Sequence, residues 1–523
     1  MSGNVNKDKP GIDSSGNPPD PLSELGQVFS TTLDSTRLEA VAKRHDKSCR
    51  TARENLADLC DPGTFVEYGQ LAVAAQRGRR SLEELRNQTP ADGIITGLAA
   101  INSKWFGESA SRAAVIVNDY TVLAGTQGHY HHQKLDRILQ LAARQKLPVV
   151  MYTEGGGGRP GDTDVTTYIA GLNINSFAAW AGLKGKVLRI AVNNGFCFAG
   201  NAALFGCADV RIATRQSWIG MAGPAMIEGG GLGNFKPTEI GPAEIQFRNG
   251  VIDLLAADEA EATQLAKQVL ACFQGPIAEY RCAPQSELWP LMPVDRRYSY
   301  HVRRVIETLA DTGSWLELGG EFGPAIVTGF IRIEGQPFGL IANDCRVLGG
   351  AIDAQAAITA SRFLRLCNRH GIAVLSLCDT PGFMVGPASE EQAAVHHMSD
   401  LFVAGAELDV PLVTIFLRKA YGLGAMAMAG GSFTRPDYAA AWPSGEFGAM
   451  GLQGAVRLGF RKELEAKTDP IEKEALFNSL LGTLYEKGKA IEAATHLEID
   501  AVIDPAQTRQ MIVQALARYR DTL

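Results

Sequence analysis

An internal repeat constrains the fold of this chain more than any other feature of its sequence. Residues 118–125 read NDYTVLAG and residues 343–350 read NDCRVLGG, with five of eight positions identical at one offset of 225 residues. A helical pattern follows each copy, LDRILQLAARQKLP and SRFLRLCNRHGIA, and leads into a short apolar strand at 149–153 or 374–378. Because the landmarks keep their order, we expect two halves built on one plan rather than a chance likeness.

The repeat continues beyond these landmarks and predicts an α/β fold of two tandem domains. Apolar strands at 188–193 and 412–417 each run into a turn of small residues, and the weaker echo of DPGTF in DTGSW lies upstream. Short strands that alternate with amphipathic helices imply largely parallel sheets with crossover helices. We place the domains at residues 33–290 and 291–523, joined by a glycine- and proline-rich stretch, and expect residues 1–32 to be a disordered arm.

Composition and charge exclude several classes of protein. The 523 residues are 46% hydrophobic and carry a net charge of −7, so bulk charge favours neither nucleic acid nor an anionic membrane as a partner. The stretch 36–58 is basic, and we interpret it as the solvated face of a helix. No apolar run suits a membrane span or a secretory signal, and nine cysteines without a CxxC pair argue against disulfides and a zinc ribbon. We therefore expect reduced thiols and a cytoplasmic location.

Two turns of small residues in matching repeat positions are the candidate functional elements. Residues 198–202 (FAGNA) and 422–425 (GLGA) each follow an apolar strand and open a predicted helix. Backbone N–H groups at a helix start have no partner within the helix, so they can bind an anion or a developing oxyanion. Small residues let a carbonyl group approach the backbone itself. Close packing of helix on strand would explain one such turn, but two at equivalent positions favour a function.

Other side chains that could carry chemistry leave alternatives open. The HYHH run could place His129 and His131 on one strand face as metal ligands, but without a third ligand we favour a polar loop or a substrate contact for His129, His131 and His132, and predict no metal. Glu154 and Asp379 stand at strand ends, where each suits either a general base or a carboxylate that ties down the following turn. Neither a GxSxG elbow nor a GxxxxGK[ST] loop occurs, which argues against a serine hydrolase and against ATP hydrolysis.

Several longer motifs resemble those of one enzyme family. The most specific are DTPGF at 379–383, RKAYG at 418–422, AWPSGEFGAMGLQGAV at 441–456, IDPAQTR at 503–509 and the N-terminal HDKSCRTARENLADLCDPGTFVEYG at 45–69. Over about residues 40–520 the chain resembles the carboxyltransferase (β) subunit of biotin-dependent acyl-CoA carboxylases, of the propionyl-CoA carboxylase type. The resemblance implies two tandem crotonase-like (ClpP/crotonase) domains, in agreement with the repeat.

The resemblance also implies an activity and its partners. The activity is transfer of CO2 from carboxybiotin to the α-carbon of an acyl-CoA, a coenzyme A thioester. The chain has no AMKM-like biotinylation site, since AMAM at 425–428 lacks lysine, so biotin would arrive on a partner, a biotin carboxylase with its biotin carboxyl carrier subunit. A homo-hexamer is implied, a trimer of dimers, with active sites between the N-domain of one subunit and the C-domain of another. Released biotin can serve as the base for the α-proton, so no protein base is required.

The same resemblance assigns roles to individual residues. It places an oxyanion hole for the thioester enolate at Ala199 and Gly200, and a hole for the ureido oxygen of biotin at Leu423 and Gly424. Substrate contacts would come from Gly156, Gly157, Arg159, Phe198 and Met426, and biotin contacts from Gly382, Phe383, Tyr421 and Gly422. Met426 stands where short-chain enzymes of the family have an acid, so we expect a different acyl group, bulkier or more apolar.

Departures from the family pattern keep two alternatives open. The glycine turn at 155–162 retains only its glycines and Arg159, and the second small-residue turn reads GLGAMAM in place of GGAYDVM. A decarboxylase would run the same half-reaction backwards through the same two holes. A non-catalytic assembly subunit would have lost CoA binding. A crotonase-type hydratase is disfavoured because no carboxylate pair can be placed.

Overall fold

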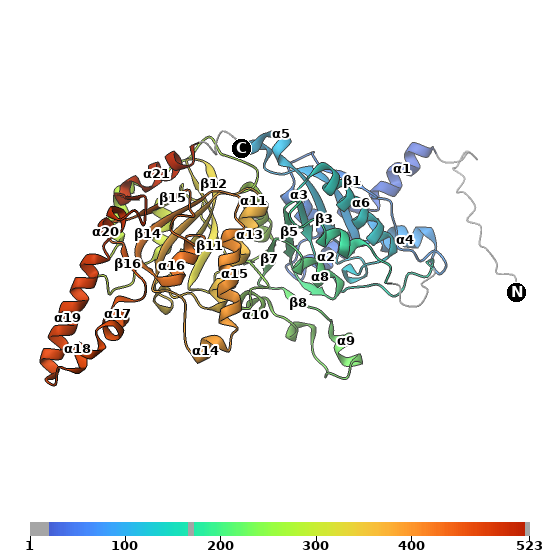
Figure 1. Cartoon of the computed structure of the whole chain (residues 1–523). Coiled ribbons are helices and arrows are strands. Elements are labelled where there is room, and N and C mark those ends of the chain that lie inside the picture. Colours follow the sequence, from blue (N-terminus) through green and yellow to red (C-terminus); the bar gives the residue numbers. More distant parts are fainter. Residues whose placement is uncertain (1–19, 166–171, 518–523) are drawn as a thin grey trace.

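The computed structural model describes residues 20–165 and 172–517. Its strands form two large sheets, one in each half of the chain (Figure 1). The first sheet has the order β1 (Val66–Tyr68), β2 (Ile94–Ala100), β3 (Arg112–Asn118), β4 (Val149–Tyr152), β5 (Arg189–Asn193), β7 (Val210–Thr214) and β9 (Leu254–Ala256). The second has the order β10 (Leu316–Leu318), β11 (Ile326–Ile333), β12 (Gln336–Asn343), β13 (Val374–Thr380), β14 (Leu412–Tyr421), β15 (Tyr438–Ala441) and β17 (Ala501–Val502). Two short strands, β6 (Phe196–Phe198) and β8 (Trp218–Gly220), pair with each other, and β16 (Glu446–Gly448) pairs with β14.

The strands of the two sheets pair in the same way. In each sheet the first three strands are antiparallel, and the remaining four pairs are parallel. Glu67 lies opposite Gly97 in β1 and β2, and Glu317 lies opposite Gly329 in β10 and β11. The predicted repeat, with largely parallel pairing, is therefore confirmed, and its upstream echoes belong to the same plan.

A steric requirement explains why the upstream motifs DPGTF and DTGSW occur in both halves. A Cβ atom at Gly97 would lie 2.3 Å from the ring of Phe65, and one at Gly329 would lie 2.8 Å from the ring of Trp315. In each half the aromatic residue after the first tight turn therefore lies over a strand glycine, where no larger residue fits. The DPGTF and DTGSW motifs thus cover the first strand pair of their own sheets.

Each half carries one long helix between its third and fourth strands. These are α6 (His129–Gln145) and α13 (Ala354–Arg369), which confirm the two helical patterns read from the sequence. The buried residues of α6 recur every three or four positions and include Leu135, Ile138, Leu139 and Ala142. Helix α13 begins after Asp353, whose side chain accepts the N–H of Ala356 at 2.8 Å as an N-cap.

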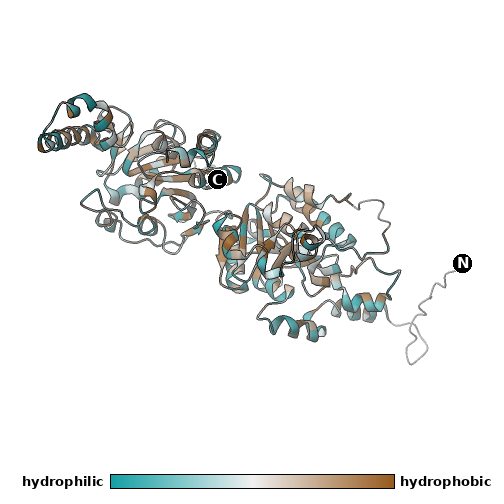
Figure 2. Ribbon diagram, turned by 90° about the horizontal axis from the view of Figure 1, so that it is seen from below, coloured by the Kyte–Doolittle hydropathy of each residue, from teal (hydrophilic) through white to brown (hydrophobic). Residues whose placement is uncertain are grey.

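The two halves share a hydrophobic core. Helix α11 (Glu259–Ala271) packs on β7 and β9, whereas α13 packs on β11 and β12, and both helices lie near the centre of the molecule (Figure 1). Phe273, just after α11, lies edge-on against Phe330 of β11 at 5.1 Å and against His370 at 5.4 Å between ring centroids. One continuous cluster of buried apolar residues contains members of both sheets. Figure 2 shows apolar segments inside both halves and hydrophilic ones on the outer helices.

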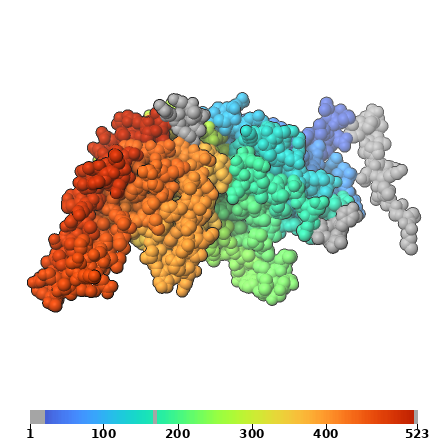
Figure 3. All heavy atoms as spheres, in the orientation of Figure 1, coloured from blue at the N-terminus to red at the C-terminus, as the bar shows by residue number. Residues whose placement is uncertain are grey.

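Other helices cover the rest of the surface, and among them α19 (Pro470–Lys487) has 18 residues. Figure 3 shows that α17–α19 project from the second half and that the segment around α9 projects from the first. No helix within 20–165 and 172–517 has the length and apolar character to cross a membrane. The helices not yet given are α1 (Pro21–Ser30), α2 (Leu38–His45), α3 (Ala52–Leu59), α4 (Leu82–Gln88), α5 (Ser103–Ser111), α7 (Ser176–Ala181), α8 (Gly200–Gly206), α9 (Pro224–Gly229), α10 (Ala243–Arg248), α12 (Val302–Leu309), α14 (Pro387–Glu390), α15 (Ala394–Ala406), α16 (Gly422–Met428), α17 (Leu452–Gly459), α18 (Arg461–Glu465), α19 (Pro470–Lys487), α20 (Ala490–Thr495) and α21 (Thr508–Ala515).

Part of the expectation for the N-terminal arm is wrong. Helix α1 lies within the segment 1–32 that we expected to be disordered. Asp20 caps the helix by accepting the N–H of Ser23 at 3.2 Å, and Pro21 occupies the first helical position. This local start signal outweighs the polar composition on which the expectation rested. Residues 1–19 of the arm lie outside the described residues, and the domain limits at 33–290 and 291–523 stay predictions.

Candidate active site

The two predicted turns lie at equivalent places in the two halves. The first opens α8 after β5 and β6, and the second opens α16 directly after β14. Both therefore stand beyond the carboxyl end of a parallel strand, which is the edge of an α/β sheet where ligands bind. The repeat thus places one set of helix-start N–H groups in each half of the chain.

The first turn leaves one of its two predicted amides free. Ala199 has a φ of 51°, and its N–H donates to the carbonyl oxygen of Gly220 at 3.1 Å. The N–H of Gly200, the first residue of α8, has no acceptor among the residues that the structure describes. A Cβ atom on Gly200 would lie 2.3 Å from Oε1 of Gln127 and 3.1 Å from the ring of Phe177, so a larger residue there would displace these two side chains. The oxyanion role of Ala199 and Gly200 stays a prediction, with Gly200 as the available donor.

The glycine turn that we expected to contact substrate packs directly on this first turn. A Cβ atom at Gly157 would lie 2.9 Å from Cβ of Ala199. Oδ1 of the buried Asn201 accepts the N–H of Gly157 at 3.0 Å, and the N–H of Gly156 donates to the carbonyl oxygen of Ala124 at 3.0 Å. Both glycine amides are thus used inside the protein. Asn201, which belongs to the FAGNA motif but was not singled out from the sequence, holds the two turns together.

Arg159 and Phe198 are buried beside the same turn. The guanidinium of Arg159 lies 2.5 Å from Oδ1 of Asp92 and donates to the carbonyl oxygen of Thr126 at 2.9 Å. Burial raises the pKa of Asp92, and the positive charge of Arg159 opposes that shift. The ring of Phe198 stacks on that of Phe196 at 5.9 Å between centroids. These contacts support the turn from within, and a substrate contact of either side chain stays a prediction.

The second turn has two free amides and a backbone segment that crosses it. Leu423 and Gly424 are the second and third residues of α16, and their N–H groups have no acceptor in the described part of the chain. A Cβ atom at Gly424 would lie 2.7 Å from Cα of Gly382 and 3.0 Å from the backbone nitrogen of Phe383. Gly422 and Gly382 have φ values of 59° and 120°, which favour glycine. The structure thus brings the DTPGF and RKAYG motifs together.

Tyr421, the last residue of β14, anchors this second turn. Its side chain is buried, and its hydroxyl donates to Oε2 of Glu446 in β16 at 2.8 Å. Burial and the adjacent Glu446 carboxylate raise the pKa of Tyr421, so the hydroxyl keeps its proton. The ring of Phe383 lies edge-on to that of Phe402 at 6.0 Å, which holds the crossing segment in place. Glu446 is a further site residue that the sequence reasoning did not single out.

The two strand-end acids are ion-paired. Glu154 accepts from Nη1 and Nη2 of Arg44 at 3.0 and 2.9 Å, and Oδ2 of Asp379 lies 3.0 Å from Nη2 of Arg418. Burial raises the pKa of Glu154, whereas the charge of Arg44 lowers it. Arg418 also donates to the carbonyl oxygen of Tyr298 at 2.6 Å. Of the two roles left open by the sequence, these contacts favour carboxylates that tie down the turns over general bases.

The HYHH run lies on a helix, so its assignment to a strand face or a loop is wrong. Residues 129–132 form the first turn of α6, because its apolar periodicity extends back from Leu135 to His131, which shares the buried face. Nε2 of His131 bonds to Oδ1 of Asn118 at 3.0 Å, and burial lowers the pKa of His131 well below its ordinary value. His132 bonds to Ser176 at 3.0 Å through Nδ1. Within the described residues no group of three or more His, Cys, Asp or Glu side chains could hold a metal ion.

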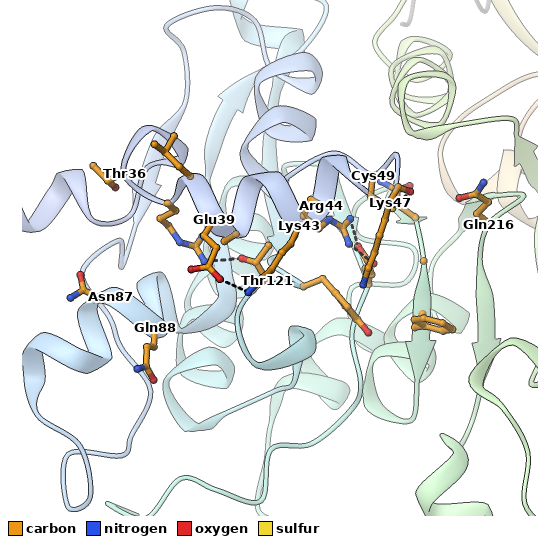
Figure 4. A pocket seen from close by; sticks show the side chains of 18 of the residues that line it. Thr36, Glu39, Lys43, Arg44, Lys47, Cys49, Asn87, Gln88, Thr121 and Gln216 are labelled. Atoms are coloured by element: carbon orange, nitrogen blue, oxygen red, sulfur yellow. Dashed lines mark hydrogen bonds and ion pairs between the residues drawn. The ribbon is translucent and has the colours of Figure 1, made fainter.

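A cavity of about 940 Å³ opens along helix α2 and reaches Phe196, two residues before the first turn (Figure 4). Lys43, Arg44 and Lys47 line it on one side. Phe196 and Trp218 also line it, and their rings stack at 4.9 Å between centroids. The basic stretch that we interpreted as a solvated helix face therefore borders a cavity, and that interpretation is incomplete. The available signal was that Lys47 follows Lys43 by four residues and Arg44 by three, a spacing that places helical residues on one side of the chain.

A second cavity, of about 480 Å³, lies at α16 beside the second turn. Leu423 and Met426 line it, and both side chains are partly exposed, at 60% and 36%. Phe433 and Phe447 contribute two further apolar side chains. The charged or titratable residues that complete the lining come from α19, α20 and the segment after α20, and they are Lys487, Glu492, His496 and Glu498. The second predicted hole thus adjoins a space that is apolar near the turn and polar further out.

Comparison with known proteins relates residues 43–522 to one family. A family model described as the carboxyl transferase domain matches residues 43–522. The methylmalonyl-CoA carboxyltransferase 12S subunit of Propionibacterium freudenreichii subsp. shermanii is 31% identical over 516 residues, which cover 95% of this chain and 93% of that protein.

Solved structures give the same result. A single-chain, multi-domain long-chain acyl-CoA carboxylase matches with a TM-score of 0.90 and 54% identity, over 95% of this chain and 49% of that one, so this chain spans about half its length. The transcarboxylase 12S hexamer, with methylmalonyl-coenzyme A and methylmalonic acid bound, matches with a TM-score of 0.83 and 29% identity over 98% and 97% of the two chains.

The fold is that of carboxyltransferases built from two tandem crotonase-like domains, as the sequence predicted. The chain belongs to the carboxyl transferase domain family.

Proposed function

We propose that the chain is the carboxyltransferase component of a biotin-dependent acyl-CoA carboxylase, which moves CO2 from carboxybiotin to the α-carbon of an acyl-CoA. The observation that carries this proposal is the pair of helix starts at α8 and α16, where the N–H of Gly200 and those of Leu423 and Gly424 are free at closely packed glycine turns. Two atoms gain negative charge in the reaction, the thioester oxygen and the ureido oxygen of biotin. Two sets of backbone donors, one in each half, match this requirement.

The residues of the two turns have separate tasks in this mechanism. Gly200 would donate to the thioester oxygen as the α-carbon loses its proton, and Leu423 and Gly424 would donate to the ureido oxygen. A donor of this kind stabilises the transition state by about 3 kcal/mol. The backbone at Gly382 and Phe383 passes so close to Gly424 that any side chain there would fill the approach to the amides, which fits a flat bound ring. When bound, biotin supplies the carboxyl group and, once freed, a base.

The cavity beside α2 suits the coenzyme A part of the substrate. Lys43 and Lys47 are exposed cations at its edge; Nζ of Lys43 lies 2.6 Å from Oε1 of Glu39, whereas Lys47 has no acidic partner among the described residues. Two such charges suit the phosphate groups of coenzyme A. The stacked rings of Phe196 and Trp218 offer an aromatic face for a base or for the pantetheine arm. Arg44 is held by Glu154 and serves to fix α2 at the cavity.

The acyl group is proposed to be long and apolar. Met426, Leu423, Phe433 and Phe447 surround the cavity at the second turn, where a short-chain enzyme of the family has an acid at the position of Met426. A flexible thioether next to aromatic rings accommodates methylene groups of varied length. The structure with 54% identity, a long-chain acyl-CoA carboxylase, supports the same substrate class.

Assembly follows the 12S relative in this proposal. That protein forms a hexamer, and we extend the hexamer, a trimer of dimers, to this chain, with each site shared between the first half of one subunit and the second half of another. Biotin would be brought by a biotin carboxylase and its biotin carboxyl carrier subunit, because AMAM at 425–428 offers no lysine for attachment. A cytoplasmic location stays a prediction.

A carboxylation assay tests the proposal. The purified chain is mixed with a biotin carboxylase–carrier partner, ATP, labelled bicarbonate and acyl-CoAs of graded length. We expect label to be fixed only when both the partner and an acyl-CoA are present, and fastest with long chains. No fixation with any acyl-CoA, despite a carboxylated carrier, would contradict the proposal. Decay of a malonyl-type CoA would then identify the decarboxylase alternative, and its absence the assembly subunit.

A further inference from the structure

A charged cavity lies where the two halves meet, and none of the predicted site residues lines it. Its volume is about 560 Å³, within the range of about 300–1,000 Å³ that is usual for small-molecule sites. Two of its lining residues are acids, Asp209 and Asp253. Six are cations, three from the first half and three from α13 of the second, and these are Lys184, Arg189, Arg211, Arg362, Arg365 and Arg369. The proposed carboxyl transfer uses none of them.

Both acids of the cavity are already neutralised by first-half arginines. Arg189 binds Asp209 through Nε and Nη2, each at 3.0 Å. Arg211 binds Asp253 through the same two atoms at 2.8 and 2.7 Å. These two-point contacts satisfy the carboxylates with good geometry. The positive charge contributed by the other cations therefore has no counterpart among the lining acids.

Three of the remaining cations lack a close counter-charge. Neither Lys184 nor Arg362 has an acidic side chain within salt-bridge distance among the described residues. Nη2 of Arg369 lies 3.9 Å from Oδ1 of Asp209, the carboxylate that Arg189 holds, and its buried Nε has no acceptor in the described part of the chain. An unpaired buried N–H of a guanidinium is costly unless a ligand accepts from it.

The arrangement of these cations on α13 concentrates their charge. Arg362, Arg365 and Arg369 are three and four residues apart, so they share one face of the helix, where like charges repel. Arg365 is bound to Asp400 outside the cavity at 2.7 and 2.8 Å. Burial lowers the pKa of Arg362, and the charge of Arg211 lowers it further. A bound anion would remove this repulsion.

We propose that the cavity binds a small phosphorylated anion between Arg362 and Arg369 of the second half and Lys184 of the first. The planar guanidinium group offers paired N–H donors that match two oxygens of a phosphate group. The unpaired Nε of Arg369 and the unpartnered Arg362 supply such donors from one helix face. Because both halves contribute, the bound anion would tie them together across their shared seam.

Binding of inorganic pyrophosphate to the full chain in its native assembly tests this site. The melting temperature is measured against pyrophosphate concentration, with ionic strength held constant by sodium chloride. We expect a saturable rise, because a ligand that binds only the folded state stabilises it. In the double variant Arg362→Gln/Arg369→Gln the affinity should fall about tenfold or more. Without pyrophosphate, that variant should melt at the same temperature or higher, since repulsion has been removed.

Matched variants separate this site from other causes. Arg137→Gln/Arg144→Gln changes the positions on α6 that stand 225 residues before Arg362 and Arg369, and it should keep the full response. Lys43→Gln/Lys47→Gln removes the two cations proposed to bind coenzyme A, so any share of the response that comes from the first cavity is lost in this variant, and the remaining rise belongs to the proposed site. A saturable rise of equal size in Arg362→Gln/Arg369→Gln, or no rise in the unaltered protein, would overturn the proposal. A loss of assembly in that variant, seen by light scattering, would also overturn it by showing that a second copy covers the cavity.

Discussion

Arg44 and Glu154 form a buried two-point ion pair that joins helix α2 to the strand end beside the first turn. Nη1 and Nη2 of Arg44 donate to Oε1 and Oε2 of Glu154 at 3.0 and 2.9 Å. Through this pair the helix that borders the first cavity is fixed to the acid that precedes the glycine turn. The position of the cavity wall and the shape of the turn are therefore coupled.

Removing Arg44 alone should be more damaging than removing the pair. In Arg44→Met the Glu154 carboxylate stays buried without its partner, and we expect a loss of about 3–5 kcal/mol in unfolding free energy. Arg44→Met/Glu154→Gln removes the isolated charge and should recover a large part of this loss. Denaturant unfolding of both variants measures the difference. Equal stability of the single and double variants would contradict the role assigned to the pair.

Gly424→Ala should block the second turn while leaving the fold intact. The new Cβ atom would lie 2.7 Å from Cα of Gly382, so the amide of Gly424 and the crossing segment must move apart. We expect carboxylation to fall at least about 100-fold, as when one oxyanion donor is lost. Gly482→Ala is the matched control, because a Cβ atom there meets nothing within 4 Å. Its activity should be unchanged, and comparable activity of the two variants would argue against a catalytic turn.

Stability should fall with acidification because of buried histidine. Burial lowers the pKa of His131 well below 6.5, so below pH 6.5 the unfolded chain takes up a proton that the folded chain does not. The unfolding free energy then decreases as pH falls, by up to about 1.4 kcal/mol per pH unit for this one group. His132 and His370, whose pKa values burial also lowers, act in the same direction. Unfolding between pH 7.5 and 5.5 should show a shallower slope in His131→Gln, and an identical slope would refute this assignment.

Met426→Asp should shift acyl-chain preference toward short chains. A carboxylate among Leu423, Phe433 and Phe447 would lose hydration when a long apolar chain is bound, which weakens binding of that chain. We expect kcat/KM for long acyl-CoAs to fall about tenfold or more relative to propionyl-CoA. The measurement is the labelled-bicarbonate assay across a panel of acyl-CoAs. An unchanged profile would remove Met426 from the set of specificity residues.

Lys43→Gln/Lys47→Gln should raise KM for the acyl-CoA without a matching loss of kcat. The two lysines lie at the edge of the first cavity, away from the free amides of either turn, so they would contribute to binding rather than to chemistry. We expect KM to rise about tenfold at low salt and the effect to shrink as salt is added, because exposed charges are screened. Lys462→Gln/Lys473→Gln, on α18 and α19, is the control. A fall in kcat at constant KM would contradict a role in coenzyme A binding.

Much of the fold could be predicted because one pattern occurs twice. The offset between Asn118 and Asn343 fixes the matching strands and helices, and both the sheet order and the strand register follow it. The turns at 198–202 and 422–425 were found in the same way, since small residues after an apolar strand are visible in the sequence. Periodicity and repetition can be read directly from the sequence, so they can be recognised without knowledge of tertiary contacts.

The features that were missed depend on tertiary contacts or on a cap. The amide of Ala199 is occupied by Gly220, and Asn201 holds Gly157, neither of which a local pattern reveals. The HYHH run is too short for its alternation to distinguish a strand from the start of a helix. The apolar periodicity that begins at Leu135 and continues beyond it makes the segment helical. The helix at 21–30 depended on the single cap at Asp20, which an argument from composition overlooks.

The packing around Phe273 determines whether the two halves of the chain can fold independently. Its ring touches Phe330 and His370, and the buried cluster around it contains residues of both sheets. Cleavage of the chain between the two halves would expose a large apolar surface on each fragment, so neither fragment should stay folded by itself. We therefore expect the whole chain to unfold as one cooperative unit, although its sequence contains one motif twice.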